Sequence, residues 1–205
     1  MNGIIAKKLG MSQIFSEDGE CIPVTVLEAG PCVVVRHKTP EVDGYSAIQL
    51  GYGDAKEQRV SKPDLGQFKK AGVAPKKTLM EVSSDDLDSW PVGSEVDVSI
   101  FAEDEQVNVS GISKGRGFSG TIRRHNFSKG PRTHGSHNVR APGSIGACSY
   151  PARVFPGKRM PGQYGAKKIT VRNLDVVKVD SDRNLLYVRG AVPGSKNGII
   201  MVRKG

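Results

Sequence analysis

The chain has 205 residues, a formal net charge of +9 at pH 7, and a composition that is 37% hydrophobic but only 6% aromatic. This length suits one compact domain or two small ones with a modest core. No apolar run approaches the roughly eighteen residues that indicate a membrane-spanning helix, so we expect no membrane partner. The first residues lack a long apolar stretch and a small-residue cleavage site, and we expect mature protein rather than a signal peptide.

The three cysteines, Cys21, Cys32 and Cys148, are odd in number and widely spaced. No pair has zinc-finger spacing, and the pattern does not indicate a disulfide framework. We therefore expect reduced thiols in a reducing compartment, with no metal and no other cofactor.

Short strands are predicted along most of the chain. At the start, Met11 to Phe15 and Cys21 to Leu27 flank an Asp18-Gly19 turn, which is typical of a β-hairpin. Further strands are predicted at residues 32–36, 45–52, 95–101, 106–112, 168–172, 176–180, 185–189 and 199–202. A spacing of roughly ten residues, with Gly or Pro between the runs, predicts a small barrel or sandwich.

Helical periodicity is weak, and only two short helices are predicted, at residues 63–71 and 119–126, the second with Ser119 as its N-cap. The fold class is therefore mainly β. We expect a discontinuous barrel built from residues 1–53, 94–112 and 167–205. Two excursions should leave it: a small α+β insertion at residues 54–93 and a basic arm at residues 113–166.

The positive charge is concentrated in that arm and its flanks. Residues 111–172 contain thirteen Lys or Arg and no Asp or Glu, which leaves 17 basic residues (30 minus 13) against 21 acidic ones elsewhere. Residues 81–105 show the reverse, with nine acids, Asp85 among them, and no Lys or Arg. A short basic run is usually a solvated face, but an acid-free basic segment of this length needs a polyanion to neutralise it.

The composition of the arm argues against a core of its own. Residues 111–172 contain eleven glycines, and Pro131, Pro142, Pro151, Pro156 and Pro161 follow one another along the arm. Periodic apolar residues are missing, so we expect the arm to be poorly ordered alone in water and ordered when threaded through RNA. The segment 81–105 is most simply a solvated edge, although it could face a basic neighbouring protein.

Three motifs in the arm have enzymatic or metal-binding readings. The run Gly115 to Gly120 matches G-x-G-x-x-G, but the next acid is Asp175, and a dinucleotide site needs a long helix and an acid about twenty residues on. His134 and His137 lie three apart without a carboxylate or a Cys pair nearby, so base or phosphate contacts are favoured over a metal. Nothing orients Cys148 as a nucleophile, and we expect a packed thiol.

Aromatic residues alternate with the cations of the arm: Phe118, Phe127, Tyr150, Phe155 and Tyr164. This pattern favours stacking on exposed bases. For Phe118 and Phe127, packing of the arm against the barrel is an equally good interpretation.

A resemblance to a known family covers nearly the whole chain. Residues 101–124, FAEDEQVNVSGISKGRGFSGTIRR, resemble the signature of the universal large-subunit ribosomal protein three family. The opening GIIAKKLGMSQIF, the segment IPVTVLEAGPC, the run APGSIG, the stretch GKRMPGQYG and LDVVKVDSDRNLLYVRGAVPG are similar to it as well. The length resembles the bacterial form. In the stretch 146–151 this chain reads GACSYP, so it lacks the glutamine that is methylated in some bacterial relatives.

The resemblance implies a fold and a function. The fold would be a six-stranded β-barrel similar to the second domain of translation elongation factors, with an arm that enters the large ribosomal RNA. The protein would be cytoplasmic and ribosomal, would not be an enzyme and would have no small-molecule substrate. Its partners would be large-subunit rRNA, which it binds early in assembly, and neighbouring large-subunit ribosomal proteins. The arm tip would lie near the peptidyl transferase centre.

The residues and the resemblance together predict two groups of site residues. Those expected to bind rRNA are Lys114, Arg116, Phe118, Arg123, Arg124, His125, Lys129, Arg132, His134, His137, Arg140, Arg153, Lys158, Arg159, Gln163, Lys167 and Lys168. Those expected at the arm tip near the catalytic RNA are Gly143, Ser144, Gly146, Ala147, Cys148 and Ser149. No catalytic or metal-binding residue is predicted.

Two other classes of protein share the charge pattern. An RNA-modifying or RNA-cleaving enzyme would need a clustered acid, base or metal site, which the arm does not offer. A free nucleic-acid chaperone or DNA-compacting protein would tolerate the arm without the barrel signature, and would bind DNA about as well as RNA.

Overall fold

The computed structural model describes residues 1–84 and 86–205; Asp85, one of the acids of the expected acidic segment, lies outside them. The chain divides into two compact units. The main unit comprises Met1–Ile112 and Lys168–Gly205, and the unit inserted in it, which we call the basic unit, comprises Ser113–Lys167. Among the described residues, no helix is long and apolar enough to cross a membrane.

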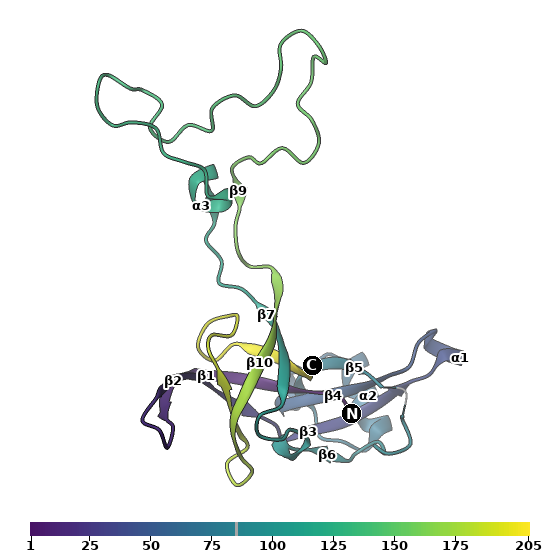
Figure 1. Ribbon diagram of the computed structural model, residues 1–205. Coiled ribbons are helices and arrows are strands. Elements are labelled where there is room, and N and C mark those ends of the chain that lie inside the picture. The colour runs from purple at the N-terminus through teal and green to yellow at the C-terminus, as the bar shows by residue number, and fades with distance from the viewer. Residues whose placement is uncertain (85) are drawn as a thin grey trace. The chain divides into compact units, whose positions relative to one another are not determined.

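A closed antiparallel barrel forms the centre of the main unit (Figure 1). Its strands follow the order β1-β12-β7-β10-β11-β2. They span Gly3–Phe15 (β1), Cys21–Ala29 (β2), Gln106–Ile112 (β7), Lys168–Asp180 (β10), Leu185–Arg189 (β11) and Ile199–Lys204 (β12). The expected fold class, mainly β with a six-stranded barrel, is confirmed.

Strands β7 and β11 of the barrel alternate between buried and less buried residues, as expected when one face of a strand points into a core. In β7, Val107, Val109 and Gly111 are buried while the residues between them are not. Gly111 is needed for close strand packing, since a Cβ there would lie 2.8 Å from Cγ2 of Ile200 on β12. The expected hairpin is present, with Phe15 of β1 opposite Cys21 of β2.

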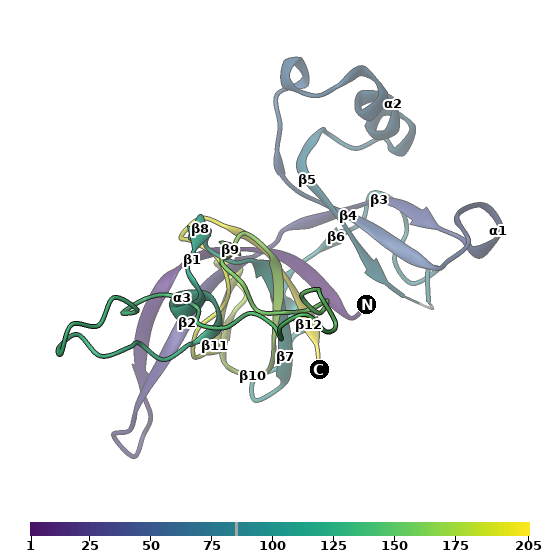
Figure 2. The same ribbon diagram turned by 90° about the horizontal axis from the view of Figure 1, so that it is seen from above.

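A second sheet in the main unit has the order β5-β4-β3-β6. Its strands are Cys32–Lys38 (β3), Ala47–Asp54 (β4), Lys76–Ser83 (β5) and Glu95–Val96 (β6). The short helices Pro40–Asp43 (α1) and Glu57–Arg59 (η1) lie in its connections, and α2 (Lys62–Ala71) packs on it through the buried ring of Phe68 (Figure 2). One hydrophobic cluster runs through both sheets, from Ile5 and Leu186 in the barrel to Leu50 and Val82 in the second sheet.

The second sheet corrects the expected extent of the barrel. We expected residues 32–53 and 94–101 to supply barrel strands, but β3, β4 and β6 pair with one another and with β5, a strand that the sequence did not predict. Strand partners are chosen by long-range packing, which a local pattern does not encode.

Two local expectations are also corrected. Residues 95–101 were expected to be one strand, but after β6 the chain turns into a 3-10 helix, η2 (Val98–Ile100), closed by the Phe101 amide donating to the Val98 carbonyl at 3.0 Å. The two strands expected at 168–172 and 176–180 are one strand, β10. The register shift between Val171 and Leu174, with Asn173 at φ 54°, breaks the alternation that the sequence suggested.

The barrel core should dominate stability. Replacing the fully buried Leu186 with Ala should lower the free energy of unfolding by about 2–5 kcal/mol, because it leaves a cavity in the barrel. Val42→Ala is the control, since that side chain is 79% exposed and its loss should change stability by less than about 0.5 kcal/mol. Urea unfolding of both variants measures this, and equal losses would contradict the assignment of the core.

Candidate nucleic-acid interface

The two ends of the basic unit run side by side as a narrow ribbon. The amide of Ser113 donates to the Lys167 carbonyl at 2.9 Å, and the amide of Arg116 donates to the Tyr164 carbonyl at 2.9 Å. Beyond them, the short strands β8 (Phe118–Ser119) and β9 (Gly162–Gln163) pair antiparallel. The ribbon therefore satisfies its own backbone groups without a hydrophobic core.

Gly165 permits the closest approach within the ribbon. It adopts φ +71°, and a Cβ at this position would lie 2.1 Å from the Lys114 carbonyl oxygen. The nearby G-x-G-x-x-G run is part of the ribbon: it contains the two residues of β8 and ends at Gly120, the N-cap of α3 (Thr121–His125). Strand β7 precedes the run, but a dinucleotide site also needs a long helix after such a loop, and α3 has only five residues.

A clamp of two side chains holds the returning chain at the end of the ribbon. Arg124 donates from Nη1 to the Met160 carbonyl at 2.6 Å, and Nε2 of His125 lies 3.1 Å from the same oxygen. Gly162 leaves room for this guanidinium, because a Cβ there would lie 2.8 Å from Nη1. Arg124 and His125 are half-buried, so their first role is to shape the unit.

Helix α3, which carries this clamp, begins differently from the prediction. Ser119 was expected as its N-cap, but the capping position is Gly120, without a side-chain capping bond. The Ser119 hydroxyl instead donates to the Arg116 carbonyl at 3.1 Å within the ribbon. The Ser119 hydroxyl thus binds a nearby backbone carbonyl instead of capping the helix.

Past the clamp, the chain forms exposed loops. One is closed by the Gly130 amide, which donates to the Val139 carbonyl at 3.0 Å. Ser119 and Thr121 are the buried residues of the whole unit, and neither is apolar. The side chains of Phe118 and Tyr150 are 79% and 90% exposed. Both rings are therefore accessible from solvent in the basic unit.

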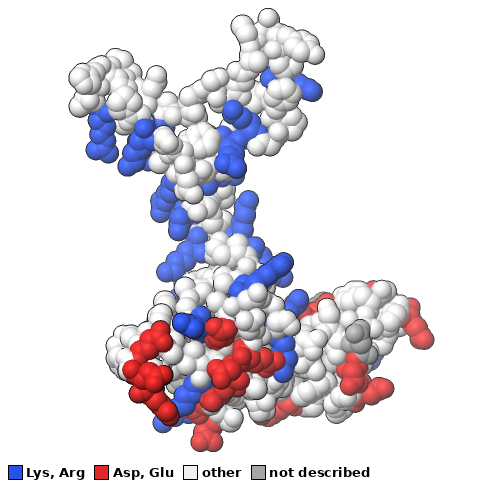
Figure 3. Space-filling model, viewed as in Figure 1, with Lys and Arg blue, Asp and Glu red and all other residues white. Residues whose placement is uncertain are grey.

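The electrostatics of the unit are one-sided. Its eleven Lys and Arg residues face no carboxylate of their own unit, and none forms an ion pair with any residue that the structure describes. The visible face of the unit in Figure 3 accordingly carries blue side chains and no red ones. The Arg116 guanidinium lies 4.8 Å from the centre of the Tyr164 ring, and that of Arg153 lies 5.8 Å from the Phe155 ring. These aromatic contacts leave the positive charges uncompensated.

The structure exposes nearly all of the residues predicted to bind rRNA. Arg124 and His125 are half-buried in the clamp, and Lys168 belongs to the main unit, where it is exposed. The other predicted residues are exposed members of the basic unit: Lys114, Arg116, Phe118, Arg123, Lys129, Arg132, His134, His137, Arg140, Arg153, Lys158, Arg159, Gln163 and Lys167. The six residues of the predicted tip, Gly143, Ser144, Gly146, Ala147, Cys148 and Ser149, are exposed as well.

The prediction for Cys148 was wrong. A packed thiol was expected, but the side chain is exposed in the tip loop, because no apolar layer covers it there. Residues 144–148 and 152–154 line an open hollow of about 390 Å³, and the Ser144 hydroxyl donates to the Gly146 carbonyl at 3.0 Å. Across the described part of the chain, no group of His, Cys, Asp or Glu side chains is arranged to hold a metal ion.

The fold and this surface define a class: a β-barrel protein with an inserted, acid-free basic unit, an arrangement typical of proteins that accompany nucleic acid. A family model described as "Ribosomal protein L3" matches residues 91–185. Over 202 residues the chain is 54% identical to the large ribosomal subunit protein uL3 of Pelotomaculum thermopropionicum, covering 98% of this chain and 96% of that protein. The chain therefore belongs to the uL3 family of ribosomal proteins.

Other relatives agree with this assignment. The large ribosomal subunit protein uL3 of Carboxydothermus hydrogenoformans is 52% identical over 202 residues, covering 98% of this chain and 96% of the relative. That of Prochlorococcus marinus is 51% identical over 201 residues, covering 98% and 93%. The resemblance seen in the sequence is confirmed, and the chain is a structural, non-enzymatic protein of the large ribosomal subunit.

The ribbon offers a direct structural test. Gly165→Ala should open it, because the new Cβ would meet the Lys114 carbonyl in a conformation that already disfavours a side chain. Hydrogen exchange at the amides of Arg116 and Tyr164 should then accelerate. Gly120→Ala is the matched control, since φ is −68° there and no atom lies within 4 Å of the added Cβ. Equal exchange in both variants would show that the ribbon does not depend on Gly165.

Proposed function

We propose that the basic unit binds large-subunit rRNA directly. The observation that carries this proposal is the absence of any carboxylate among eleven exposed or half-exposed cations. Each Lys or Arg side chain that neutralises a phosphate displaces counterions from the RNA. This counterion release supplies the sequence-independent part of the affinity. The mixture of Arg and Lys suits contacts to a folded backbone better than reading of base edges.

The exposed aromatic residues supply the second part of the interface. Phe118 and Tyr150 expose most of their rings, and Phe155 is 57% exposed beside Arg153. Aromatic rings next to guanidinium groups are suited to stacking on unpaired bases, a contact worth roughly 1–3 kcal/mol per base. The sequence had indicated both Phe118 and Tyr150 as candidates for base stacking, but only Phe118 was included among the predicted rRNA-binding residues.

Binding of this kind would help to nucleate assembly of the subunit. The loops of the basic unit bury no apolar side chain. Contacts with a partner would therefore order these loops more than contacts within them. The main unit has its own continuous core and can fold first. RNA that folds around the loops would then be held in one arrangement, which is the role of an early-binding protein.

The tip of the unit would approach the peptidyl transferase centre, as the resemblance implies. Six of the seven residues from Gly143 to Ser149, all except Ile145, are small, and all seven are exposed. Small side chains let a backbone pass through narrow crevices in folded RNA. The tip carries no arrangement of acid, base and nucleophile. Its effect would therefore be to position RNA rather than to react.

Salt dependence tests the direct contact. Replacing Arg123, Arg132 and Arg140 with Gln should weaken binding of the full chain to large-subunit rRNA and lower the slope of log K against log salt by about 2–3, at roughly 0.7–0.9 per phosphate. In the control, three exposed cations of the main unit are replaced with Gln, which removes the same amount of charge: Lys178, Arg183 and Lys196. A slope unchanged in the first variant would refute the electrostatic account.

The tip is tested separately. Ala147→Trp should leave the yield of large subunits near normal, because the side chain is exposed and the loop has no core to disturb. It should change the rate of peptidyl transfer, or sensitivity to drugs that bind the catalytic centre, in purified particles. Val42→Trp, on an exposed site of the main unit, is the control. Loss of particles together with normal activity in the survivors would place the tip elsewhere.

A further inference from the structure

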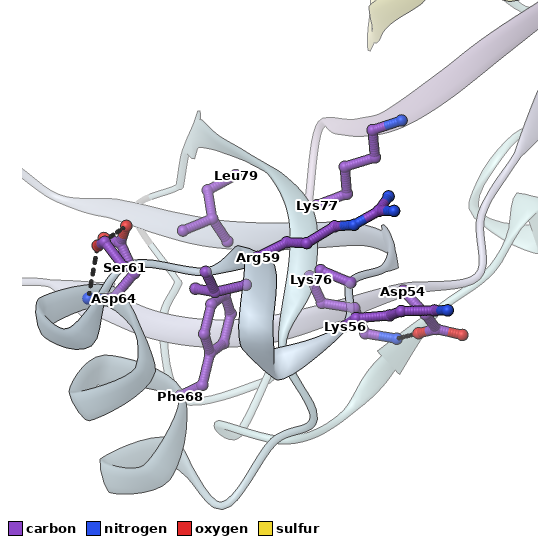
Figure 4. A pocket seen from close by; sticks show the side chains of 11 residues that line it. Asp54, Lys56, Arg59, Ser61, Asp64, Phe68, Lys76, Lys77 and Leu79 are labelled. Atoms are coloured by element: carbon purple, nitrogen blue, oxygen red, sulfur yellow. Dashed lines mark hydrogen bonds and ion pairs between the residues drawn. The ribbon is translucent and has the colours of Figure 1, made fainter.

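A cavity in the main unit has a basic rim that the basic unit does not explain. It measures about 800 Å³ and lies where the connection from β4 to α2 meets the start of β5. Its apolar floor includes Leu79 and the buried ring of Phe68. Figure 4 shows Lys56, Arg59 and Lys77 extending toward the same side of the cavity, with Phe68 and Leu79 at its other end.

Local structure brings the three cations together. The turn η1 is closed by the Arg59 amide donating to the Lys56 carbonyl at 2.9 Å, and residues three apart in a 3-10 turn lie on the same side. Strands β4 and β5 pair Asp54 with Lys76, and the next residue, Lys77, lines the same cavity as that turn. Two segments far apart in the sequence thus contribute to one rim.

The acids at the cavity are already engaged. The Asp54 carboxylate accepts from Lys76 Nζ at 2.7 Å, and this contact lowers the pKa of Asp54 below its usual value. The Asp64 carboxylate accepts from the Ser61 hydroxyl at 2.6 Å at the start of α2. In contrast, Lys56, Arg59 and Lys77 are exposed, and none has an ion-pair partner among residues 1–84 and 86–205.

This grouping is unusual for the unit in which it occurs. The main unit holds 19 basic residues (30 minus the eleven of the basic unit) and 21 acidic ones, a net charge of −2. Carboxylates are therefore plentiful, yet the lining of the cavity has four cations, including Lys76, and two acids. A solvated surface normally intermixes the signs, so a group of unpaired cations indicates an anionic partner.

We infer that the rim formed by Lys56, Arg59 and Lys77 is a second RNA contact, in which phosphates of an RNA strand lie against the three cations. The inference rests on the proposed function, since a chain that binds rRNA through its basic unit already holds RNA at high local concentration. Two linked contacts strengthen each other by effective concentration. Flexible, hydrated Lys side chains suit phosphate contacts, and the apolar floor accommodates the sugar or base of the strand.

The test compares triple variants of the full chain in binding to large-subunit rRNA. Lys56→Gln, Arg59→Gln and Lys77→Gln together should weaken binding several-fold and lower the salt slope by about 2–3. The matched control is again Lys178, Arg183 and Lys196 changed to Gln, which should have a much smaller effect. Circular dichroism and urea unfolding of the variants establish that the exposed substitutions leave the fold intact.

A footprint gives a second readout. Bound RNA should protect the amines of Lys56 and Lys77 from acetylation in the wild-type chain, while Lys178 stays reactive. Binding that is weakened by the basic-unit variant but not by the rim variant, with Lys56 and Lys77 reactive, would overturn this inference and leave the proposed function standing. Protection that appears only in assembled subunits, and not with naked rRNA, would also overturn it and would indicate an acidic protein neighbour. Failure of the wild-type chain to bind rRNA would instead refute the proposed function.

Discussion

Strands β7 and β10 pair antiparallel with Ile112 opposite Lys168, the two residues that flank the basic unit. The barrel is closed by this pairing, and the same pairing brings the ends of a 55-residue insertion (113 to 167) together. Bringing the ends of so long a loop together costs conformational entropy. The strand contacts that hold the barrel together offset this cost. Within the basic unit, the ribbon that begins at Ser113 and Lys167 is held by its own backbone hydrogen bonds and needs no core.

The two units are stabilised in different ways. The main unit buries a continuous apolar cluster and carries a net charge of −2, so its stability comes from packing. The basic unit carries +11 and buries two polar residues, and its shape depends on backbone hydrogen bonds, glycines and the Arg124 clamp. Self-repulsion of those charges opposes any compact free state. In the function proposed above, RNA neutralises the charges that the basic unit leaves unpaired.

Charge has different meanings in the two units. In the basic unit, the sequence alone removes every internal partner, because no acid is present. In the main unit, acids are abundant, and only geometry decides which cations they reach. Lys76 pairs with Asp54 and Lys38 pairs with Asp43, whereas the neighbouring Lys77 has no such partner among the described residues. Counting charges along the chain therefore identified the basic unit. The same count could not reveal the rim of the cavity, because acids and cations are mixed along the main unit.

The sequence by itself determined the mainly β class, the hairpin at Asp18-Gly19, the strands at 106–112 and 185–189, and the basic segment. Each of these rests on local information: alternation, turn residues or the absence of acids. Only the tertiary structure decided that β3, β4 and β6 join β5 in a second sheet, that Arg124 and His125 bind the Met160 carbonyl, and that Lys56, Arg59 and Lys77 line one cavity. Those outcomes depend on which distant segments pack together, and packing is a property of the whole chain rather than of any stretch within it.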